Sequence, residues 1–528
     1  MKWIAAVVLL FLTVTAQAQQ SPEEAANWRA DLQVMAAEME HRHKDLYHSI
    51  SREEFAKEVQ ALDARIPSLQ RHEIIVELMR LAARVGDGHT NVAPTRDAKI
   101  GFHALPVRLY FFEDGLYVRA AAAPELVGAR VTQIGGVPVD EAYRRVGELI
   151  SRDNEFGVKQ FAPLLLAMPE VLHALKLSRA IDAADFTFAD GRTVTLQPYA
   201  LFEPMPADTD TSWEIPAGWT DARGSKPPLW LENPRELHRL ARIGDALYVQ
   251  LNQVNDAPDE TLEAFAARIE KTNAETKPKT LILDLRLDRG GNGHLRTPLM
   301  KAIIRSPMAD VRGRLFVLTS RATFSAAQFL VDDLQTETSA IFIGEPTSSK
   351  PNVFGDSRKI TLPHSGITVR ASIYWWQRHP AESDMQWLPV DIAAPLRFAD
   401  YARNIDPALE AAMHYTPEPT LRETFARAFA TGGVEAAKQA LAAFDANPVH
   451  RYAERELELL RGALDTKSLD ALRLAATALP RSAEAHIMLA DALARAKDLA
   501  GARAEAKKAL ELDPKNYEAE AILRSLPN

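Results

Sequence analysis

The chain has 528 residues, a formal net charge of −9 and no cysteine, and 47% of its residues are hydrophobic. This length predicts two or three domains with large apolar cores. The negative charge does not favour nucleic acid or an anionic membrane as a partner. The lack of cysteine excludes disulfides, thiolate catalysis and a lipid-anchored cysteine.

Residues 1–18 have the pattern of a secretory signal peptide. Lys2 supplies the positive start, Trp3–Val14 the apolar run, and Ala16-Gln17-Ala18 a small-residue cleavage site. No later apolar stretch is long enough to cross a bilayer. We therefore expect an exported protein, periplasmic or secreted, that has no membrane span.

Residues 19–90 are predicted to form an N-terminal helical domain. Ser21-Pro22-Glu23-Glu24 and Ser51-Arg52-Glu53-Glu54 each have the pattern of a capped helix start. The domain also carries a group of polar side chains that could suggest a metal: Glu38, Glu40, His41, His43 and His48. Because His41 and His43 are two residues apart, they point to different helix faces. We therefore favour a solvated face here and predict no metal site.

The helical segment ends at the sequence GDGHT, Gly86–Thr90, where the two glycines present His89 on a tight turn. Residues 91–200 then have a β-rich pattern with short strands and turns. The predicted strands and hairpin are Leu105–Phe111, Leu116–Arg119, Ala129–Ile134 and Phe186–Leu196. Residues 201–240 are rich in proline, tryptophan and aspartate without periodicity, which predicts a long surface loop.

Strands and helices alternate over residues 241–400, which predicts an α/β layer structure. A buried strand at Thr280–Leu283 runs into DLRLDRGGNG, Asp284–Gly293. Glycines directly after a buried strand let backbone N–H groups approach a ligand, so Gly290 and Gly291 predict an anion nest. A phosphate site is a weak alternative, because the glycine spacing and the lysine of known phosphate loops are missing.

Ser325 lies where a polar loop turns into a predicted helix, Ser325–Leu334, after a buried strand at Leu315–Leu318. Its hydroxyl would face unpaired backbone N–H groups at the positive end of the helix dipole. This location suits a serine nucleophile, whose oxyanion needs aimed donors. The alternative is that Ser325 only caps the helix. A strand at Ala340–Ile343 then leads into the polar loop that holds Lys350.

Residues 415–528 are predicted to form helical repeats. Ala490, Ala502 and Ala509 fall where a tetratricopeptide repeat of about 34 residues needs small side chains. Pro448, Pro480 and Pro514 mark the ends of successive units. Such helix pairs stack and offer a concave surface to a protein partner. The alternative, a plain helical cap without a partner, stays open.

The motifs DLRLDRGGNG, FSAAQ and GEPTSSK follow one another in this order, with GDGHT upstream and WLPVD, Trp387–Asp391, downstream. Together they resemble the C-terminal-processing (tail-specific) serine peptidases, the family that also includes the tricorn-protease core. The resemblance implies an α/β (α+β) core of the ClpP/crotonase-like type. It also implies a partial PDZ-like segment at ELVGARVTQIGGVPVDEA, between the N-terminal helical domain and the catalytic core.

The resemblance also implies roles for individual residues. Ser325 would be the nucleophile, and the oxyanion donors would be the amides of Ala326 and of Gly290 or Gly291. Lys350 follows Ser325 at the spacing of the family's Ser–Lys dyad, whereas the tricorn-like branch has a histidine base, which would be His89. We favour His89, because a neutral lysine base requires a strongly lowered pKa. The orienting acid of that branch falls at Asp384, with Glu382 two residues away.

The predicted function is that of an exported serine peptidase, which hydrolyses peptides or unstructured protein tails without a metal or organic cofactor. The repeats could bind the substrate or a protein partner. The alternative function is that of a catalytically inactive peptide- or protein-binding protein, which uses the same cleft and the helical repeats.

Overall fold

The structure is a computed structural model that describes residues 20–202, 213–224, 226–381, 383 and 385–527. The predicted signal peptide, residues 1–18, lies outside these residues, as do Asp384 and Glu382. Within the described residues, no helix has both the length and the apolar character to cross a membrane.

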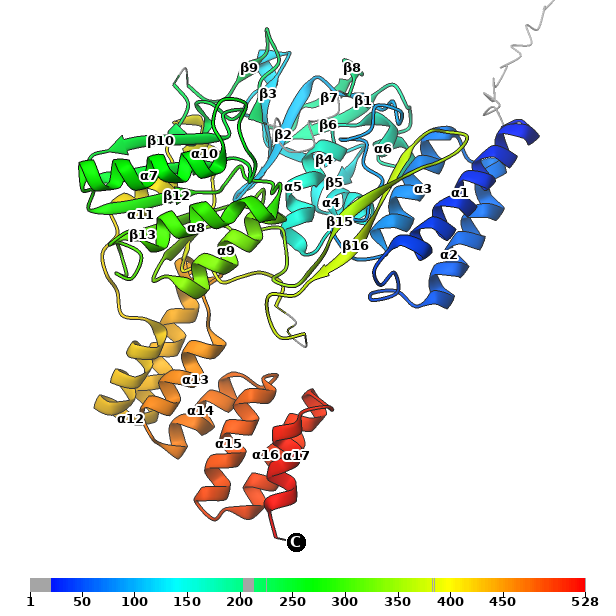
Figure 1. Cartoon of the computed structure of the whole chain (residues 1–528). Helices are drawn as coiled ribbons and strands as arrows, with labels where there is room; N and C mark the ends of the chain where they lie inside the picture. The colour runs from blue at the N-terminus through cyan, green and yellow to red at the C-terminus, as the bar shows by residue number, and fades with distance from the viewer. Residues whose placement is uncertain (1–19, 203–212, 225, 382, 384, 528) are drawn as a thin grey trace, which may run out of the picture.

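The N-terminal segment contains three helices, α1 (Pro22–Arg42), α2 (Arg52–Arg65) and α3 (Arg71–Ala83) (Figure 1). The first two begin at the capping boxes that the sequence predicts, with Ser21 paired to Glu24 and Ser51 to Glu54. Their apolar faces join one core with the β-rich segment that follows. The N-terminal helices are therefore packed against the rest of the molecule.

The β-rich segment contains a three-stranded sheet, a four-stranded sheet and helices that pack against them. The first sheet has the order β2-β3-β9, with β2 (Val107–Phe112), β3 (Gly115–Ala121) and β9 (Thr220–Asp221). The second has the order β5-β4-β6-β7, with β4 (Val131–Ile134), β5 (Val137–Pro138), β6 (Ala184–Phe188) and β7 (Thr193–Leu196). A short ladder joins β1 (His103–Ala104) to β8 (Ala200–Leu201). The helices are α4 (Val139–Gly147), α5 (Glu155–Leu165) and α6 (Pro169–Ala174).

A six-stranded sheet forms the α/β core, with the order β10-β11-β12-β13-β14-β17. Only β10 is antiparallel to its neighbour, and the other pairs are parallel. The strands are β10 (His238–Ile243), β11 (Ala246–Leu251), β12 (Thr280–Asp284), β13 (Leu315–Thr319), β14 (Ile341–Gly344) and β17 (Ile392–Ala393). The helices of this region are α7 (Leu262–Thr276), α8 (Thr297–Ile304), α9 (Ala326–Glu337), α10 (Phe398–Ala402) and α11 (Pro407–Met413).

The carboxyl ends of parallel strands lie at the same end of their sheet, and the loops at this end carry the predicted site. The loop after β12 carries Gly290 and Gly291, the loop after β13 carries Ser325, and the loop after β14 carries Lys350. These loops leave three neighbouring strands, so residues far apart in sequence meet at one end of the sheet.

A long hairpin connects this edge with the N-terminal helices (Figure 1). It contains β15 (Val353–Thr361) and β16 (Thr368–Trp376), and the sequence analysis did not predict it. Near its turn, Asp31 of α1 accepts hydrogen bonds from the backbone N–H groups of His364 and Ser365. The backbone of Asn91, two residues after His89, pairs with Arg370 of β16. The hairpin therefore brings the His89 turn to the edge of the core sheet.

The C-terminal segment is an array of helices that lies below the core in Figure 1. Its helices are α12 (Leu421–Ala446), α13 (Glu456–Asp465), α14 (Leu469–Ala478), α15 (Ala483–Arg495), α16 (Leu499–Leu512) and α17 (Tyr517–Ser525). A non-helical Gly433 divides α12 into two parts. Ala490, Ala502 and Ala509 are fully buried, as close helix packing requires. The tetratricopeptide-like and PDZ-like descriptions stay predictions.

A buried ion-pair network attaches the loop after β12 to α11, and its contribution to stability can be tested. Arg286 contacts Asp284 at 2.6 Å and Asp406, the N-cap of α11, at 2.7 Å. Arg286→Leu would leave both carboxylates buried without a counter-charge, so we expect a loss of about 3–5 kcal/mol in the free energy of unfolding. Urea denaturation measures it. Arg144→Leu, in an exposed pair with Glu141, is the control, and its stability should stay close to that of wild type. Equal losses in the two variants would contradict the prediction.

Candidate active site

Ser325 occupies the N-cap position of α9, but its side chain does not cap the helix. Its backbone has φ 58° and ψ −120°, a conformation that non-glycine residues rarely adopt. The Ser325 N–H donates to Ser349 Oγ at 3.0 Å, which helps to fix this turn. The hydroxyl is therefore free to make a contact outside the helix, and the simple capping role does not describe it.

The hydroxyl of Ser325 forms a hydrogen bond with His89, 236 positions earlier in the chain. The distance between Ser325 Oγ and His89 Nε2 is 2.9 Å. The His89 ring stacks on Phe324 at 4.6 Å between centroids, which fixes its plane. The two residues have the contact that a serine nucleophile and its general base require.

Burial lowers the pKa of His89 to about 4, and the nearby charge of Arg96 acts in the same direction. The charges of Asp87 and Asp356 and the backbone of Phe354 oppose this shift. His89 is therefore neutral at pH 7, which is the form that can accept a proton. Its Nδ1 atom is buried and makes no hydrogen bond of good geometry within the described part of the chain.

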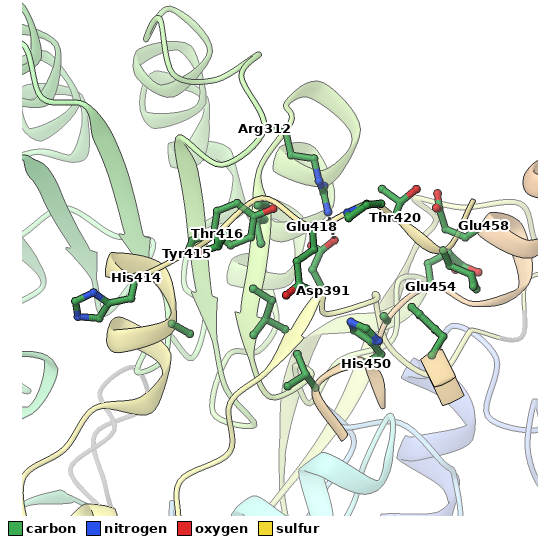
Figure 2. A pocket seen from close by; sticks show the side chains of 18 residues that line it. Arg312, Asp391, His414, Tyr415, Thr416, Glu418, Thr420, His450, Glu454 and Glu458 are labelled. Carbon is green, nitrogen blue, oxygen red and sulfur yellow. Dashed lines mark hydrogen bonds and ion pairs between the residues drawn. The ribbon is translucent and has the colours of Figure 1, made fainter. Parts of the chain in front are cut away.

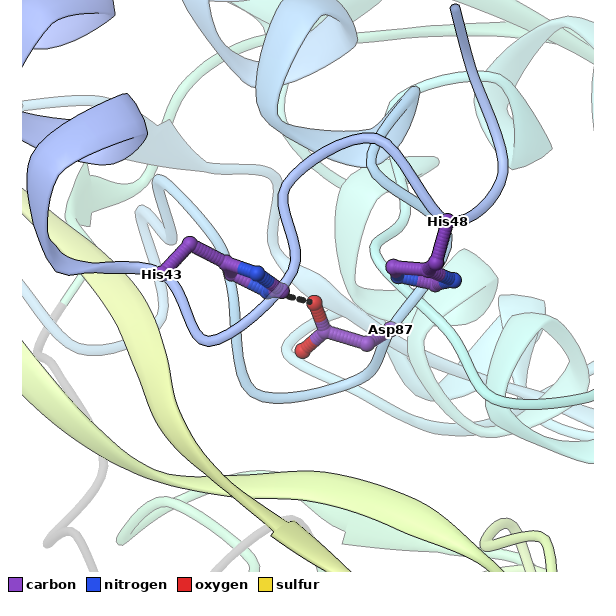
Figure 3. A group of neighbouring side chains, drawn as sticks. All are labelled: His43, His48 and Asp87. Carbon is purple, nitrogen blue, oxygen red and sulfur yellow. Dashed lines mark hydrogen bonds and ion pairs between the residues drawn. The ribbon is translucent and has the colours of Figure 1, made fainter. Parts of the chain in front are cut away.

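Asp87 supports the turn that carries His89. Its Oδ1 accepts the backbone N–H groups of His89 and Thr90, at 2.9 and 2.8 Å, and the hydroxyl of Ser372 at 2.8 Å. Its Oδ2 contacts His43 Nε2 at 2.9 Å (Figure 3). Burial raises the pKa of Asp87, but hydrogen bonds from His43 and Ser372 outweigh it and hold the pKa below its ordinary value. Asp87 is therefore a buried, ionised carboxylate with four donors.

The prediction that the histidines near residue 43 form a solvated face is wrong for His43, whose residue is only 6% exposed. The reason is that the chain leaves the helix at His43, which turns the ring inward toward Asp87. Ligand atoms of His43, His48 and Asp87 lie within 4.8 Å of one another (Figure 3). However, His43 Nδ1 accepts the Asp45 N–H, so Nε2 carries the proton and has no lone pair for a metal. His43 and Asp87 are therefore a hydrogen-bonded support for the His89 turn, and His48 stacks on the His43 ring.

The glycine loop lies directly against Ser325. A Cβ atom on Gly290, whose φ is 101°, would lie 2.7 Å from Ser325 Cβ and 2.9 Å from the Ala326 nitrogen. Only glycine allows this approach. The Gly290 N–H donates to Asp288 Oδ1 at 2.9 Å, whereas the amides of Gly291 and Ala326 make no hydrogen bond within the described residues. Of the two predicted glycine donors, Gly291 is therefore the one available to a ligand.

Lys350, the other candidate base, lines a pocket of about 510 Å³ together with His48 and Asp153, and no hydrogen bond joins it to Ser325 within the described residues. Burial and the charge of Asp87 raise the pKa of Asp153 to about 7, while Lys350 acts to lower it. Ser325, His89, the glycine loop and Ala326 therefore meet, whereas Lys350 faces Asp153. The predicted acid, Asp384, lies outside the described residues.

Sequence reasoning missed two supporting residues. Asp87 belongs to the GDGHT motif, and an aspartate two residues before a turn histidine is a signal for a local side-chain to backbone hydrogen bond. Asn154 holds three carbonyl groups of distant loops, and nothing in its local sequence marks this role.

Comparison with solved structures finds mature CPAF complexed with lactacystin, which is 12% identical, with 74% of this chain and 97% of that chain covered and a TM-score of 0.51. A second structure of mature CPAF is 12% identical over 74% and 96% of the two chains, with a TM-score of 0.49. The photosystem II D1 C-terminal processing protease is 14% identical over 71% and 94%, with a TM-score of 0.33. No family model and no curated protein matches the chain. The first comparison shows that the chain has the mixed α/β fold of mature CPAF.

The lowered pKa of His89 predicts its titration. We expect the Cε1 proton resonance of His89 to titrate near pH 4, well below the ordinary histidine pKa of about 6.5. NMR spectroscopy measures this shift, and the spectrum of His89→Gln assigns the resonance. A midpoint at the ordinary histidine value of about 6.5 for His89 would contradict the prediction.

Proposed function

We propose that this protein is an exported serine peptidase of the C-terminal-processing type, which hydrolyses peptides or unstructured protein tails. The observation that carries the proposal is the 2.9 Å contact between Ser325 Oγ and His89 Nε2. A serine that is free of its capping role, bonded to a neutral histidine and adjacent to unpaired amides has the parts that acyl transfer needs. The ordered motifs and the fold shared with mature CPAF support the same function.

In the proposed mechanism, Ser325 Oγ attacks the peptide carbonyl while His89 Nε2 takes the hydroxyl proton. The negative charge that forms on the carbonyl oxygen is stabilised by the N–H groups of Ala326 and Gly291. The protonated His89 then donates its proton to the leaving amine, and the acyl group stays on Ser325. Water, deprotonated by His89, hydrolyses the ester and restores the hydroxyl.

His89 is the proposed base, and Lys350 is assigned a different role. His89 contacts the hydroxyl and is neutral, whereas Lys350 lines the pocket next to Asp153. The ionised Asp87 supplies negative charge close to the imidazolium that forms during the reaction. The buried Nδ1 of His89 lies near the Phe354 backbone without a hydrogen bond of good geometry, and we propose Asp384 as the acid that orients the ring.

An active-site-directed fluorophosphonate probe tests the enzyme against the inactive binding protein. We expect it to label the wild-type protein at Ser325 and to leave Ser325→Ala unlabelled, because the phosphonylated oxygen is then missing. Intact-mass spectrometry measures the adduct. The matched control is Ser320→Ala, which removes a hydroxyl that accepts from the Ala322 amide near the same loop. A folded wild-type protein that stays unlabelled would support the binding function instead.

Substitution of the two candidate bases separates their roles. We expect His89→Ala to reduce the rate of probe labelling by about 10³-fold or more, since the attacking hydroxyl loses its proton acceptor. Lys350→Ala should reduce it by less than about tenfold. The time course of adduct formation gives both rates. The reverse order of the two effects would make Lys350 the base, and a large loss in Asp384→Ala would support its orienting role.

A further inference from the structure

The repeat region meets the catalytic core through the short segment between α12 and α13. This segment contains the 3₁₀ helix η6 (Pro448–His450) and continues to Ala453. The Val390 N–H donates to the Tyr452 carbonyl at 2.9 Å, and Arg451 forms an ion pair with Glu113. On its other side, His450 and Glu454 line a pocket of about 400 Å³ that they share with Arg312 and Asp391 of the core (Figure 2). Polar contacts at this segment thus attach the repeat region to the catalytic core.

Tyr452 of this segment packs its half-buried ring against the core. The ring meets Phe156 of α5 edge-on at 5.5 Å and Trp387 at 6.4 Å between centroids. Phe156 and Trp387 also contact each other at 5.4 Å, so the three rings form a cluster. Burial raises the pKa of Tyr452 to about 12, and the charge of Glu345 acts in the same direction. The ring therefore lies near the loop that follows β14.

Asn154 connects this aromatic cluster to the catalytic loops. It caps α5, and its Oδ1 accepts the N–H of Phe156 at 2.9 Å. Its Nδ2 donates to Gln386, beside Trp387, at 2.8 Å, and to Thr347 and Ser349 at 3.0 and 3.2 Å. The buried side chain of Asn154 thus connects the start of α5, which carries Phe156, and the segment of Trp387 to the loop after β14.

The loop after β14 is in turn hydrogen-bonded to the turn that carries Ser325. The fully buried Ser349 accepts the Ser325 N–H through its hydroxyl at 3.0 Å. The Ser348 N–H donates to the Thr323 carbonyl at 3.0 Å, so the two loops are bonded at two points. A displacement of residues 347–349 would therefore change the rare backbone conformation that frees the Ser325 hydroxyl.

We propose that Tyr452 is a positioning residue for Ser325, and that the repeat region is thereby a structural part of the catalytic unit. The ring holds Phe156 and Trp387, Asn154 transmits their position to residues 347–349, and Ser349 fixes the turn of Ser325. This inference rests on the proposed function and extends it, because the repeats then support the site whether or not they also bind a partner.

Three variants test the role of Tyr452 by fluorophosphonate labelling of the full chain. We expect Tyr452→Ala to lower the maximal labelling rate by about 10–100-fold, with the probe concentration at half-maximal rate changed less than about twofold. Tyr452→Phe keeps the ring and should restore the rate to within about threefold of wild type. Tyr517→Ala removes a tyrosine of the same repeat region that is 71% exposed, and it should have no effect. A wild-type rate in Tyr452→Ala would overturn the inference.

Amide hydrogen exchange gives a second readout that does not depend on activity. In Tyr452→Ala, the amides of Ser325 and Ser348 should exchange at least about tenfold faster than in wild type, because their acceptors are less firmly held. Exchange in β12 and β13 should not change, which separates local release from global unfolding. Unchanged exchange at Ser325 and Ser348 would overturn the inference. Failure of the wild-type protein to react with the probe would instead contradict the proposed peptidase function.

Discussion

The site depends on the backbone conformation of Ser325. A serine at a helix N-terminus ordinarily bonds to the helix amides, which would occupy the hydroxyl. Here φ 58° and ψ −120° direct the side chain away from α9. This conformation is unfavourable for a residue with a Cβ atom, so the surroundings must hold it. Ser349 binds its amide, and Gly290 lies so close that a side chain there would collide with Ser325.

The site depends, secondly, on the charges around His89. Burial lowers the pKa of His89 to about 4 and keeps the ring neutral, but the ring of a proposed base must become positive during proton transfer. The ionised Asp87, two residues away, favours the charged ring and opposes the cost of burial. Hydrogen bonds from His43 and Ser372 stabilise this carboxylate in turn. The segment after α1 and the β15–β16 hairpin would therefore contribute directly to the proposed chemistry at the edge of the core sheet.

Local pattern was sufficient to predict the core strands, the capped helices at Ser21 and Ser51, and the position of Ser325 before α9. These features depend on periodicity and on side chains near in sequence. The burial of His43 and the three contacts of Asn154 depend on partners far away in the chain. The β15–β16 hairpin pairs two segments that are near in sequence, and the sequence analysis missed it although its pairing is local. The choice between Gly290 and Gly291 depends on which amide Asp288 occupies, a detail that spacing does not encode.

Lys350 follows Ser325 at the spacing of the Ser–Lys dyad, but this spacing alone does not make it the general base. A lysine base must be neutral, which requires a strongly lowered pKa. Asp153 is buried beside it, with its pKa raised to about 7 by burial and by the charge of Asp87. The positive charge of Lys350 favours the ionised form of Asp153, whose Oδ1 accepts the Gly88 N–H at 2.7 Å next to His89. A neutral lysine would remove that support. This arrangement supports the proposal that His89, and not Lys350, is the base.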